Sequence, residues 1–193
     1  MKKESPKLMK NRSCAKQLMR EELIKIRKGL CEARKKQAAH NAYLQLSEKL
    51  KPYKSILSFY SIKNEININL LNQDLFKEHK LLLPKIEDTG LSAHKITKFE
   101  FISSAFGILE PHPEFSIPIP LEQIDCILVP ALGFDRLCHR IGYGKGHYDQ
   151  FLEKLKKDHF KPYTIGIGFQ EQLCIKPLPA ERHDIALDEL LLF

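Results

Sequence analysis

Apolar residues recur at helical spacing in the first part of this chain. After Ser13, a candidate N-cap, they fall at Leu18, Leu23 and Leu30, which predicts an amphipathic helix. A second helix is expected to end before Pro52, because the residue preceding a proline disfavours helical geometry. Two more helices are expected further along. The predicted helices cover residues 14–30, 31–50, 68–79 and 148–157.

Short and nearly continuous apolar runs of strand length alternate with these helices. The predicted strands cover residues 54–60, 80–84, 97–101, 125–132 and 163–169. A proline-punctuated loop is expected over residues 107–120. Apolar strands separated by helices are typical of a parallel sheet whose two faces are both covered. The pattern therefore predicts an α/β fold with a mostly parallel sheet.

The composition is that of an ordinary protein with one core. The chain has 193 residues, of which 43% are hydrophobic and 28% charged. We expect a single domain over residues 13–193, preceded by a basic and poorly ordered tail over residues 1–12. There is no apolar run of membrane length, no signal peptide, and no C-x-x-C spacing among the five cysteines. We therefore expect a cytoplasmic protein with reduced thiols and no membrane association.

The net charge of +7 is concentrated at the N-terminus. Residues 1–40 contain 13 Lys and Arg against 4 Asp and Glu, a net +9, so the remainder carries −2. A basic arm of this kind can bind nucleic acid. Here the cations alternate with apolar positions at helical spacing and lack interleaved aromatic residues. A solvated helix face is therefore the favoured interpretation, and nucleic-acid binding is a minor alternative.

Residues 140–149 form the most informative segment of the chain. Three glycines lie within five positions there, namely Gly142, Gly144 and Gly146. Glycines let a backbone approach an anion closely, and successive N–H groups can then cradle phosphate. Lys145 and Arg140 add positive charge, and Asp149 adds a carboxylate able to hold an accompanying Mg²⁺. No hydroxyl follows the lysine, so this is not a Walker loop. The segment predicts a nucleotide-phosphate site, against the alternative of a glycine turn with solvated charges.

Residues 130–149 as a whole resemble the signature of the 5-formyltetrahydrofolate cyclo-ligase family, also called 5,10-methenyltetrahydrofolate synthetases. Similarity to this family extends over nearly the whole chain beyond the first dozen residues. Further matches occur in order at residues 16–20, 60–66, 109–111 and 183–188. Four ordered matches are specific, whereas the glycine motif alone is not.

The resemblance implies a reaction and a fold. The reaction is the ATP- and Mg²⁺-dependent closure of 5-formyltetrahydrofolate to 5,10-methenyltetrahydrofolate, with release of ADP and phosphate through an iminium phosphate. The fold is a three-layer α/β arrangement with helices on both faces of the sheet, of the kind shared with ribose-5-phosphate isomerase and CoA transferases. We expect a monomer that uses the folate with or without a polyglutamate tail.

The resemblance also implies roles for individual residues. The expected catalytic residues are Lys145, Arg140 and His147. The expected ATP-binding residues are Lys16, Arg20, Arg140, Gly142, Gly144, Lys145, Gly146 and Tyr148. The expected folate-binding residues are Tyr60, Glu65, Tyr143 and His147. The expected Mg²⁺ ligands are Asp149 and Asp188.

Simpler roles stay open for several of these residues. Asp149 could stabilise the N-terminus of a helix, and Asp188 could cap an element or lie at the surface. Glu65 could be an ordinary loop carboxylate. Lys16 and Arg20 lie four residues apart on one helix face and could be solvated.

The chain departs from the family pattern at two positions. The family usually has Tyr-Tyr-Asp where this chain has His-Tyr-Asp at residues 147–149, and a glycine is often found where Cys138 stands. His147 keeps a flat ring and a hydrogen-bonding atom, so we expect altered affinity rather than lost activity. The alternative hypothesis is a catalytically weak relative that binds folate or nucleotide as a regulatory module.

Overall fold

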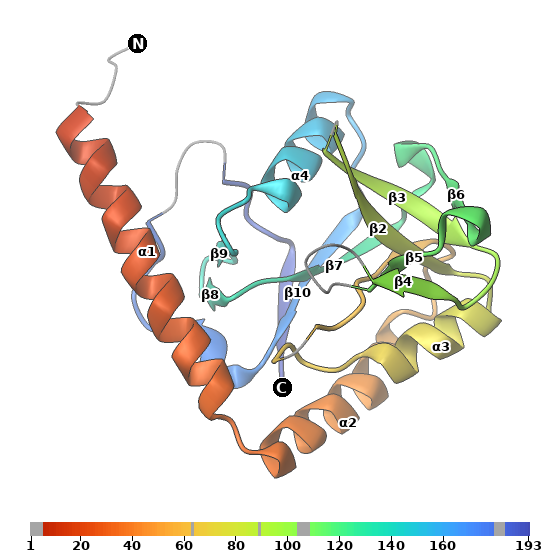
Figure 1. The fold of residues 1–193 in the computed structure, drawn as a ribbon, viewed down its shortest axis with the longest axis horizontal. Coiled ribbons are helices and arrows are strands. Elements are labelled where there is room, and N and C mark those ends of the chain that lie inside the picture. Colours follow the sequence, from red (N-terminus) through yellow and green to blue (C-terminus); the bar gives the residue numbers. More distant parts are fainter. Residues whose placement is uncertain (1–5, 63, 89, 104–108, 180–183) are drawn as a thin grey trace.

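The computed structural model describes residues 6–62, 64–88, 90–103, 109–179 and 184–193. Two helices at the N-terminus, α1 (Pro6–Gly29) and α2 (Glu32–Lys49), meet at an angle and wrap around one side of a sheet (Figure 1). Two shorter helices follow, α3 (Asn69–Lys77) and α4 (His147–Lys157). No helix in these described ranges is long and apolar enough to cross a membrane.

The main sheet has seven strands in the order β12-β10-β7-β1-β2-β3-β6. In that order their bounds are Glu189–Leu192, Tyr163–Gly168, Cys126–Pro130, Ile56–Leu57, Leu81–Glu87, Gly90–Ile96 and Ser116–Pro118. The four neighbouring pairs from β12 to β2 are parallel, and the β2–β3 and β3–β6 pairs are antiparallel. The prediction of a mostly parallel sheet is confirmed.

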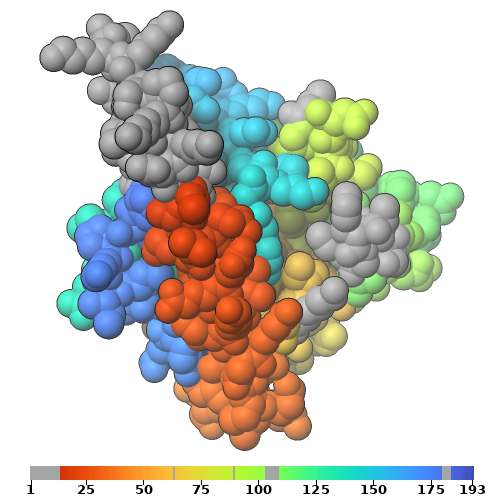
Figure 2. Space-filling model, turned by 60° about the vertical axis from the view of Figure 1, so that its left-hand side comes forward, coloured from red at the N-terminus to blue at the C-terminus, as the bar shows by residue number. Residues whose placement is uncertain are grey.

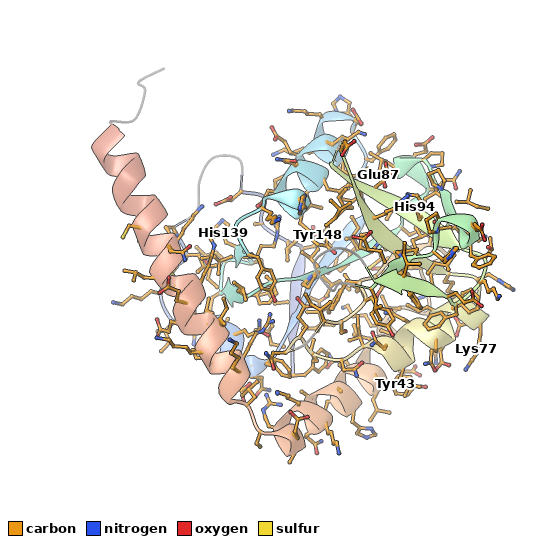
Figure 3. All side chains as sticks on the ribbon, viewed as in Figure 1. Tyr43, Lys77, Glu87, His94, His139 and Tyr148 are labelled. Atoms are coloured by element: carbon orange, nitrogen blue, oxygen red, sulfur yellow. The ribbon has the colours of Figure 1, made fainter. Side chains whose placement is uncertain are left out.

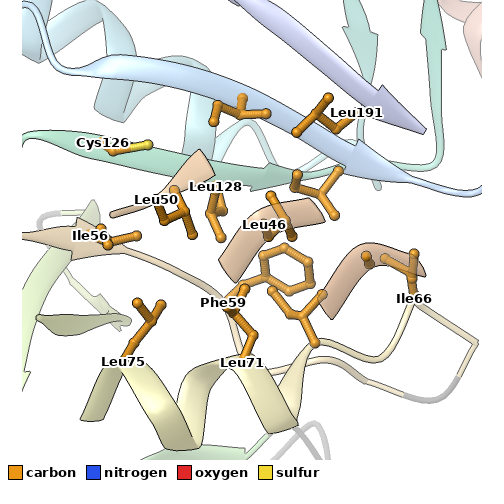
Figure 4. Close-up of a cluster of buried hydrophobic side chains, with 14 of the residues drawn as sticks. Leu46, Leu50, Ile56, Phe59, Ile66, Leu71, Leu75, Cys126, Leu128 and Leu191 are labelled. Atoms are coloured by element: carbon orange, nitrogen blue, oxygen red, sulfur yellow. The ribbon is translucent and has the colours of Figure 1, made fainter. Parts of the chain in front are cut away.

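Side chains alternate between the two faces of the sheet, and each face has its own helical cover. Ile56 and Leu128 point to a cluster completed by α2 and α3, which Figure 4 shows in close-up. Leu57 and Ile127, each one residue from those positions, point to a second cluster completed by Phe151 and its neighbours on α4. Adjacent strand residues face opposite sides, so both faces are apolar and both must be covered. The predicted helices on both faces are confirmed.

Two small sheets lie outside this frame. One has the order β11-β8-β9, with bounds Leu173–Cys174, Gly133–Asp135 and Arg140–Ile141, and the other pairs β4 (Phe101–Ser103) with β5 (Leu109–Pro111). The 3₁₀ turns are η1 (Pro113–Phe115), η2 (Leu121–Gln123) and η3 (Gln170–Gln172). Helix α1 packs on the first small sheet through Leu23, which belongs to a third apolar cluster with Leu132 and Ile141. A Cβ at Gly133 would lie 2.6 Å from Leu23 Cδ1, so glycine permits this close approach.

The start of the first helix differs from its prediction. Helix α1 begins at Pro6 rather than after Ser13, so the predicted N-cap is wrong and residues 6–12 are helical instead of a tail. Proline suits the first position of a helix, because an N–H there has no intrahelical partner. Pro6 is therefore the signal in the sequence that marks the start of α1. Residues 1–5 lie outside the described residues. The prediction of a single domain over residues 13–193 stays a prediction.

The strand predictions fail where apolar character is weak. The strand expected over residues 97–101 is wrong, since 97–100 form the bend between β3 and β4. Strand β3 reads Gly-Leu-Ser-Ala-His-Lys-Ile and has too little apolar character to be recognised as a buried strand. The short strands β8, β9, β11 and β12 were also not predicted. Part of the expected loop over residues 107–120 is strand, and residues 107 and 108 lie outside the described residues.

Strand β3 carries a buried histidine that should make stability depend on pH. His94 is 3% exposed, and its Nδ1 has no hydrogen-bond partner among the described residues. Its Nε2 lies 3.0 Å from Ser92 Oγ, with Glu87 and Lys85 nearby (Figure 3). Burial lowers the pKa of His94, and Lys85 lowers it further while Glu87 opposes both.

The unfolded chain therefore takes up a proton near pH 6.5 that the folded protein does not. We expect the free energy of unfolding to decrease as pH falls below about 6.5, by less than about 1.4 kcal/mol per pH unit from this group. Chemical denaturation between pH 7.5 and 5 measures it. His94→Gln should flatten the slope, whereas His40→Gln at an exposed position should not. An unchanged slope in His94→Gln would contradict the assignment.

Candidate active site

The glycine loop follows strand β9 and leads directly into helix α4. Gly144 has φ 96° and Gly146, the N-cap of α4, has φ 71°, both in the region that favours glycine. A Cβ at Gly144 would also lie 3.4 Å from the guanidinium carbon of Arg20. Gly142 has open space around it and no positive φ, so its conformation does not require glycine. The loop is a left-handed turn at a helix N-terminus, a geometry suited to binding anions.

Helix α1 turns a row of basic side chains toward this loop. Arg20 Nε donates to the carbonyl of Gly142 at 3.0 Å. Lys16 Nζ lies 3.1 Å from Asp184 Oδ2, with both side chains 16% exposed. Figure 2 shows α1 running across this face beside the residues of the loop and of α4. The structure therefore brings the predicted Arg20 to the loop and Lys16 to the C-terminal segment, while their role toward ATP stays a prediction.

A third cation of the same helix was not predicted as a site residue. Arg27 is 5% exposed, and its Nη2 donates to the hydroxyl of Tyr143 at 2.6 Å. The hydroxyl of Tyr143 lies 3.2 Å from Glu65 Oε1, and Arg27 Nη1 lies 4.0 Å from the same oxygen. The side chain of Glu65 is 8% exposed. Arg27 lies seven residues after Arg20, and this spacing is the signal in the sequence that puts both arginines on the same face of the helix.

The environment of Glu65 has two opposing effects on its charge. Burial raises the pKa of the Glu65 carboxyl, while Arg27, the backbone N–H of Ile62 and the Tyr143 hydroxyl lower it. The N–H of Ile62 donates to Oε2 at 3.2 Å, and Tyr143 meets Oε1. Among the described residues, each oxygen of the Glu65 carboxylate thus accepts one hydrogen bond. A carboxylate oxygen has two lone pairs, so each can accept a further hydrogen bond from a ligand.

Arg140 and Asp149 are paired with one another. Arg140 Nη2 donates to Asp149 Oδ1, and Arg140 Nη1 donates to the carbonyl of Ile185 at 2.8 Å. Burial lowers the pKa of Arg140, and the neighbouring carboxylates of Asp149 and Asp184 oppose that effect. Asp149 stands in the first turn of α4, where a carboxylate also stabilises the helix dipole. Arg140 therefore anchors the end of the loop to the C-terminal segment.

The C-terminal segment carries two carboxylates with different partners. Asp188 Oδ2 accepts from the N–H and the hydroxyl of Thr164, at 2.8 and 2.7 Å, at the start of β10. Asp184 pairs with Lys16 and lies in the electrostatic reach of Arg140. Asp188 therefore stabilises a strand end, and its role as a Mg²⁺ ligand stays a prediction. The preceding His183 lies outside the described residues.

The remaining predicted residues are distributed around the loop. Lys145 is exposed on it, and His147 is half-buried at the first position of α4. The hydroxyl of Tyr148 is buried without a hydrogen-bond partner among the described residues, and burial raises its pKa (Figure 3). Glu65 raises that pKa and Arg140 lowers it, so the Tyr148 hydroxyl lies within reach of both charges. The ring of Tyr60 lies 4.6 Å from that of Phe101, centre to centre.

The loop has more cations around it than Lys145 and Arg140. Arg20 binds the loop carbonyl, Arg27 binds the side chain of Tyr143, and Arg140 begins the segment. The described residues contain no group of three or more His, Cys, Asp or Glu that would enclose a metal ion. Mg²⁺ is commonly bound by one or two carboxylates together with water and ligand oxygens, so its binding here stays a prediction.

Both halves of the site follow the carboxyl ends of neighbouring strands. Strand β1 leads to Glu65, and the parallel strand β7 leads through β8 and β9 to the glycine loop. Ligands of open α/β sheets bind at this edge. The fold and site together define an α/β protein in which a glycine loop at a helix N-terminus contacts a buried carboxylate, through Tyr143 and Glu65.

Comparison with known proteins identifies the family. The profile of the 5-formyltetrahydrofolate cyclo-ligase family matches residues 12–192. The chain is 30% identical to 5-formyltetrahydrofolate cyclo-ligase of Mus musculus over 166 residues, which are 79% of this chain and 76% of the mouse protein. It is 29% identical to that of Haemophilus influenzae over 185 residues, or 91% and 96% of the two chains. The chain belongs to the 5-formyltetrahydrofolate cyclo-ligase family.

A solved structure agrees with this relationship. The 5,10-methenyltetrahydrofolate synthetase of Aquifex aeolicus superposes with a TM-score of 0.78 at 28% identity, covering 91% of this chain and 88% of that one. The recognition made from residues 130–149 and the four ordered matches is confirmed.

The hydrogen bonds between Asp188 and Thr164 lead to a stability prediction. Asp188→Ala should lower the free energy of unfolding by roughly 1–2 kcal/mol, because it leaves the N–H of Thr164 without its acceptor. Urea denaturation measures this change. Asp158→Ala, at the C-terminal end of α4, is the matched carboxylate control and should change stability little. Equal effects of the two substitutions would show that the bonds to Thr164 contribute nothing.

Proposed function

We propose that this chain closes 5-formyltetrahydrofolate to 5,10-methenyltetrahydrofolate in an ATP-dependent reaction that releases ADP and phosphate. Membership of the cyclo-ligase family supports the reaction class. The single observation that carries the proposal is the 3.2 Å contact between Tyr143 Oη and Glu65 Oε1. This contact puts an anion-binding loop and a buried carboxylate side by side, as a reaction between a nucleotide and a pterin requires.

The chemistry needs the formyl oxygen to become a leaving group. That oxygen attacks the γ-phosphorus of ATP, the bond to the β-phosphate breaks, and ADP leaves. The N5 lone pair moves onto the formyl carbon and yields an iminium phosphate. N10 of the same folate then bonds to that carbon and loses its proton as phosphate departs. The protein supplies positioning and charge neutralisation for these steps.

The loop and the helix cations fit the phosphates. We assign the backbone N–H groups of residues 142–146, with Lys145, to the transferred phosphoryl group. Arg20 reaches the same loop from α1, and Lys16, four residues earlier on that helix, pairs with Asp184; both are assigned to the rest of the triphosphate. Arg140 is proposed to stabilise the phosphates through its buried positive charge and to position Asp149 through their ion pair. His147 stands beside the loop at the start of α4 and is proposed to contact both the folate and the reacting groups.

The carboxylate side of the site fits the pterin. Glu65 has an acceptor direction left on each oxygen, which suits the amino and ring N–H donors of a pterin. Tyr60 follows the same strand and offers a ring face next to Phe101. The buried Tyr148 hydroxyl, in reach of both Glu65 and Arg140, is placed to donate to an oxygen between the two ligands.

Mg²⁺ is proposed to arrive with ATP as part of the substrate. Asp149 is retained as a ligand, and Asp184 is proposed in place of Asp188 as the second carboxylate. Asp184 lies in the electrostatic reach of Arg140, the partner of Asp149, whereas Asp188 is engaged with Thr164. In the free protein both carboxylates are neutralised by Arg140 and Lys16. These two cations would pass to phosphate oxygens when the metal takes the carboxylates. The five free cysteines support a reducing compartment such as the cytoplasm.

Turnover is the direct test. Purified protein with 5-formyltetrahydrofolate, ATP and Mg²⁺ should form a product that absorbs in the near ultraviolet, with ADP released in equal amount. Omission of ATP or Mg²⁺ should stop the reaction. Binding of both ligands without turnover would favour the regulatory-module hypothesis.

Removal of the loop lysine should slow the reaction without unfolding the protein. Lys145→Ala is expected to reduce kcat/KM by about a hundredfold or more, since one donor to a transition-state charge is typically worth ~2.7–4 kcal/mol. Lys145 is exposed, so its removal should not change the thermal midpoint. Lys156→Ala, an exposed lysine on α4, is the control for charge alone. Near-normal turnover in Lys145→Ala would remove this residue from the phosphate site.

The two aspartates of the C-terminal segment give a matched test of the metal assignment. Asp184→Asn should raise the Mg²⁺ concentration needed for half-maximal rate several-fold, because it removes a charged ligand. Asp188→Asn should leave that concentration unchanged, because its carboxylate is engaged with Thr164. Rates measured over a Mg²⁺ series at fixed ATP distinguish the two. The opposite result would restore Asp188 as the ligand.

A further inference from the structure

Three side chains from distant parts of the chain form a relay that links the two halves of the site. Arg27 comes from α1, Tyr143 from the glycine loop, and Glu65 from the segment after β1. The Arg27–Tyr143 and Tyr143–Glu65 contacts span 2.6 and 3.2 Å. Tyr143 stands between two of the loop glycines, so a displacement of the loop displaces this hydroxyl.

The direction of the hydrogen bonds in this relay is determined by its two ends. A guanidinium can only donate, and an ionised carboxylate can only accept. The hydroxyl of Tyr143 must therefore accept from Arg27 and donate to Glu65. With Glu65 ionised, this proton arrangement satisfies all three groups.

The burial of Arg27 is unfavourable unless the relay is intact. Its Nε has no hydrogen-bond partner among the described residues, and its Nη1 reaches the carbonyl of Ala131 at a long 3.4 Å. A buried charge with incomplete pairing is costly, and removal of one partner of a buried pair is more so. Tyr143 is 49% exposed, so the residue adds little to the core, and Arg27 contacts both its hydroxyl and its ring, whose centre lies 5.6 Å from the guanidinium carbon. The arrangement therefore depends on the loop being in place.

We propose that Arg27 is a positioning residue that, through Tyr143, couples occupancy of the glycine loop to the readiness of Glu65 to bind the folate. This inference rests on the proposed function and names an energetic link within that site. The relay is already formed in the structure, and phosphate bound to the loop would further restrict Tyr143 to this position. Folate on Glu65 favours the same position, so each ligand strengthens the binding of the other by an equal factor.

The relay also sets the charge of Glu65. The titratable groups that face it are Arg27 of α1, Tyr143 of the loop and Tyr148 of α4, and Lys35 of α2 binds the adjacent Asn64. Of these, Arg27 is the cation that lowers the pKa of Glu65 against the effect of burial. Loss of Arg27 should therefore raise that pKa and move the acid limb of kcat/KM to higher pH.

The test measures folate affinity with and without a non-hydrolysable ATP analogue plus Mg²⁺. The variants are Arg27→Met, Arg27→Lys and Tyr143→Phe. Tyr143→Phe removes one hydroxyl from a half-exposed ring and is the variant safest for folding. Arg34→Met is the matched control, since Arg34 also anchors a helix through a bidentate pair, with Glu171 at 2.7 and 2.8 Å.

In the wild type we expect the analogue to tighten folate binding by about fivefold or more. Tyr143→Phe and Arg27→Met should bring that factor close to one. Arg27→Met should also shift the acid limb of kcat/KM to higher pH, and its kcat/KM should recover in part at alkaline pH. Arg27→Lys should keep the acid limb near its wild-type position while losing most of the coupling, because a single ammonium cannot serve both Tyr143 and Ala131.

Arg34→Met should lower stability and leave the coupling factor unchanged. A coupling factor near one in the wild type, or an unchanged factor in Tyr143→Phe, would overturn the inference. Product formation without coupling would overturn it alone and leave the proposed function standing. Absence of any folate binding would overturn both.

Discussion

The two residues of strand β1 are the constraint on which the site depends. Ile56 and Leu57 are fully buried on opposite faces, and each pairs with β2 on one side and β7 on the other. Because β1 and β7 are parallel, the segments that follow them emerge at one edge of the sheet. A slip of one residue would turn each side chain to the wrong face. Strand register therefore brings Glu65 close to the glycine loop, and the geometry of the loops only completes the contact.

Helix α1 shows how a strongly basic segment can serve one site. Three of its cations contact residues more than a hundred positions further along the chain. Lys16 pairs with Asp184, while Arg20 and Arg27 contact the glycine loop. Their apolar neighbour Leu23 fixes the helix on the small sheet, at a place where Gly133 allows close contact. The excess positive charge of the N-terminus is thus partly turned inward, where it offsets Asp184 and Glu65 and leaves a positive surface for an anionic ligand.

Much of the fold was predictable from sequence, because long apolar runs have only one way to be buried. Helices α2, α3 and α4 and strands β7 and β10 lie close to their predicted ranges. Local features of the site were predictable for the same reason, since Gly144 and Gly146 carry their backbone requirement within a few residues. The pairing of Lys16 with Asp184 was not predictable, because it joins residues 168 positions apart in the chain. The role of Arg27 likewise appears only when three segments are brought together.

The pairing of Lys16 with Asp184 has a consequence for how the protein matures. These residues lie in the first tenth and the last tenth of the chain, and strand β12, which ends at Leu192, completes the edge of the sheet. During synthesis α1 leaves the ribosome well before residue 184, so the contact between Lys16 and Asp184 can form only after the strands from β1 to β10 have been made. Docking of this part of α1 is therefore a late event in folding, which follows assembly of most of the sheet.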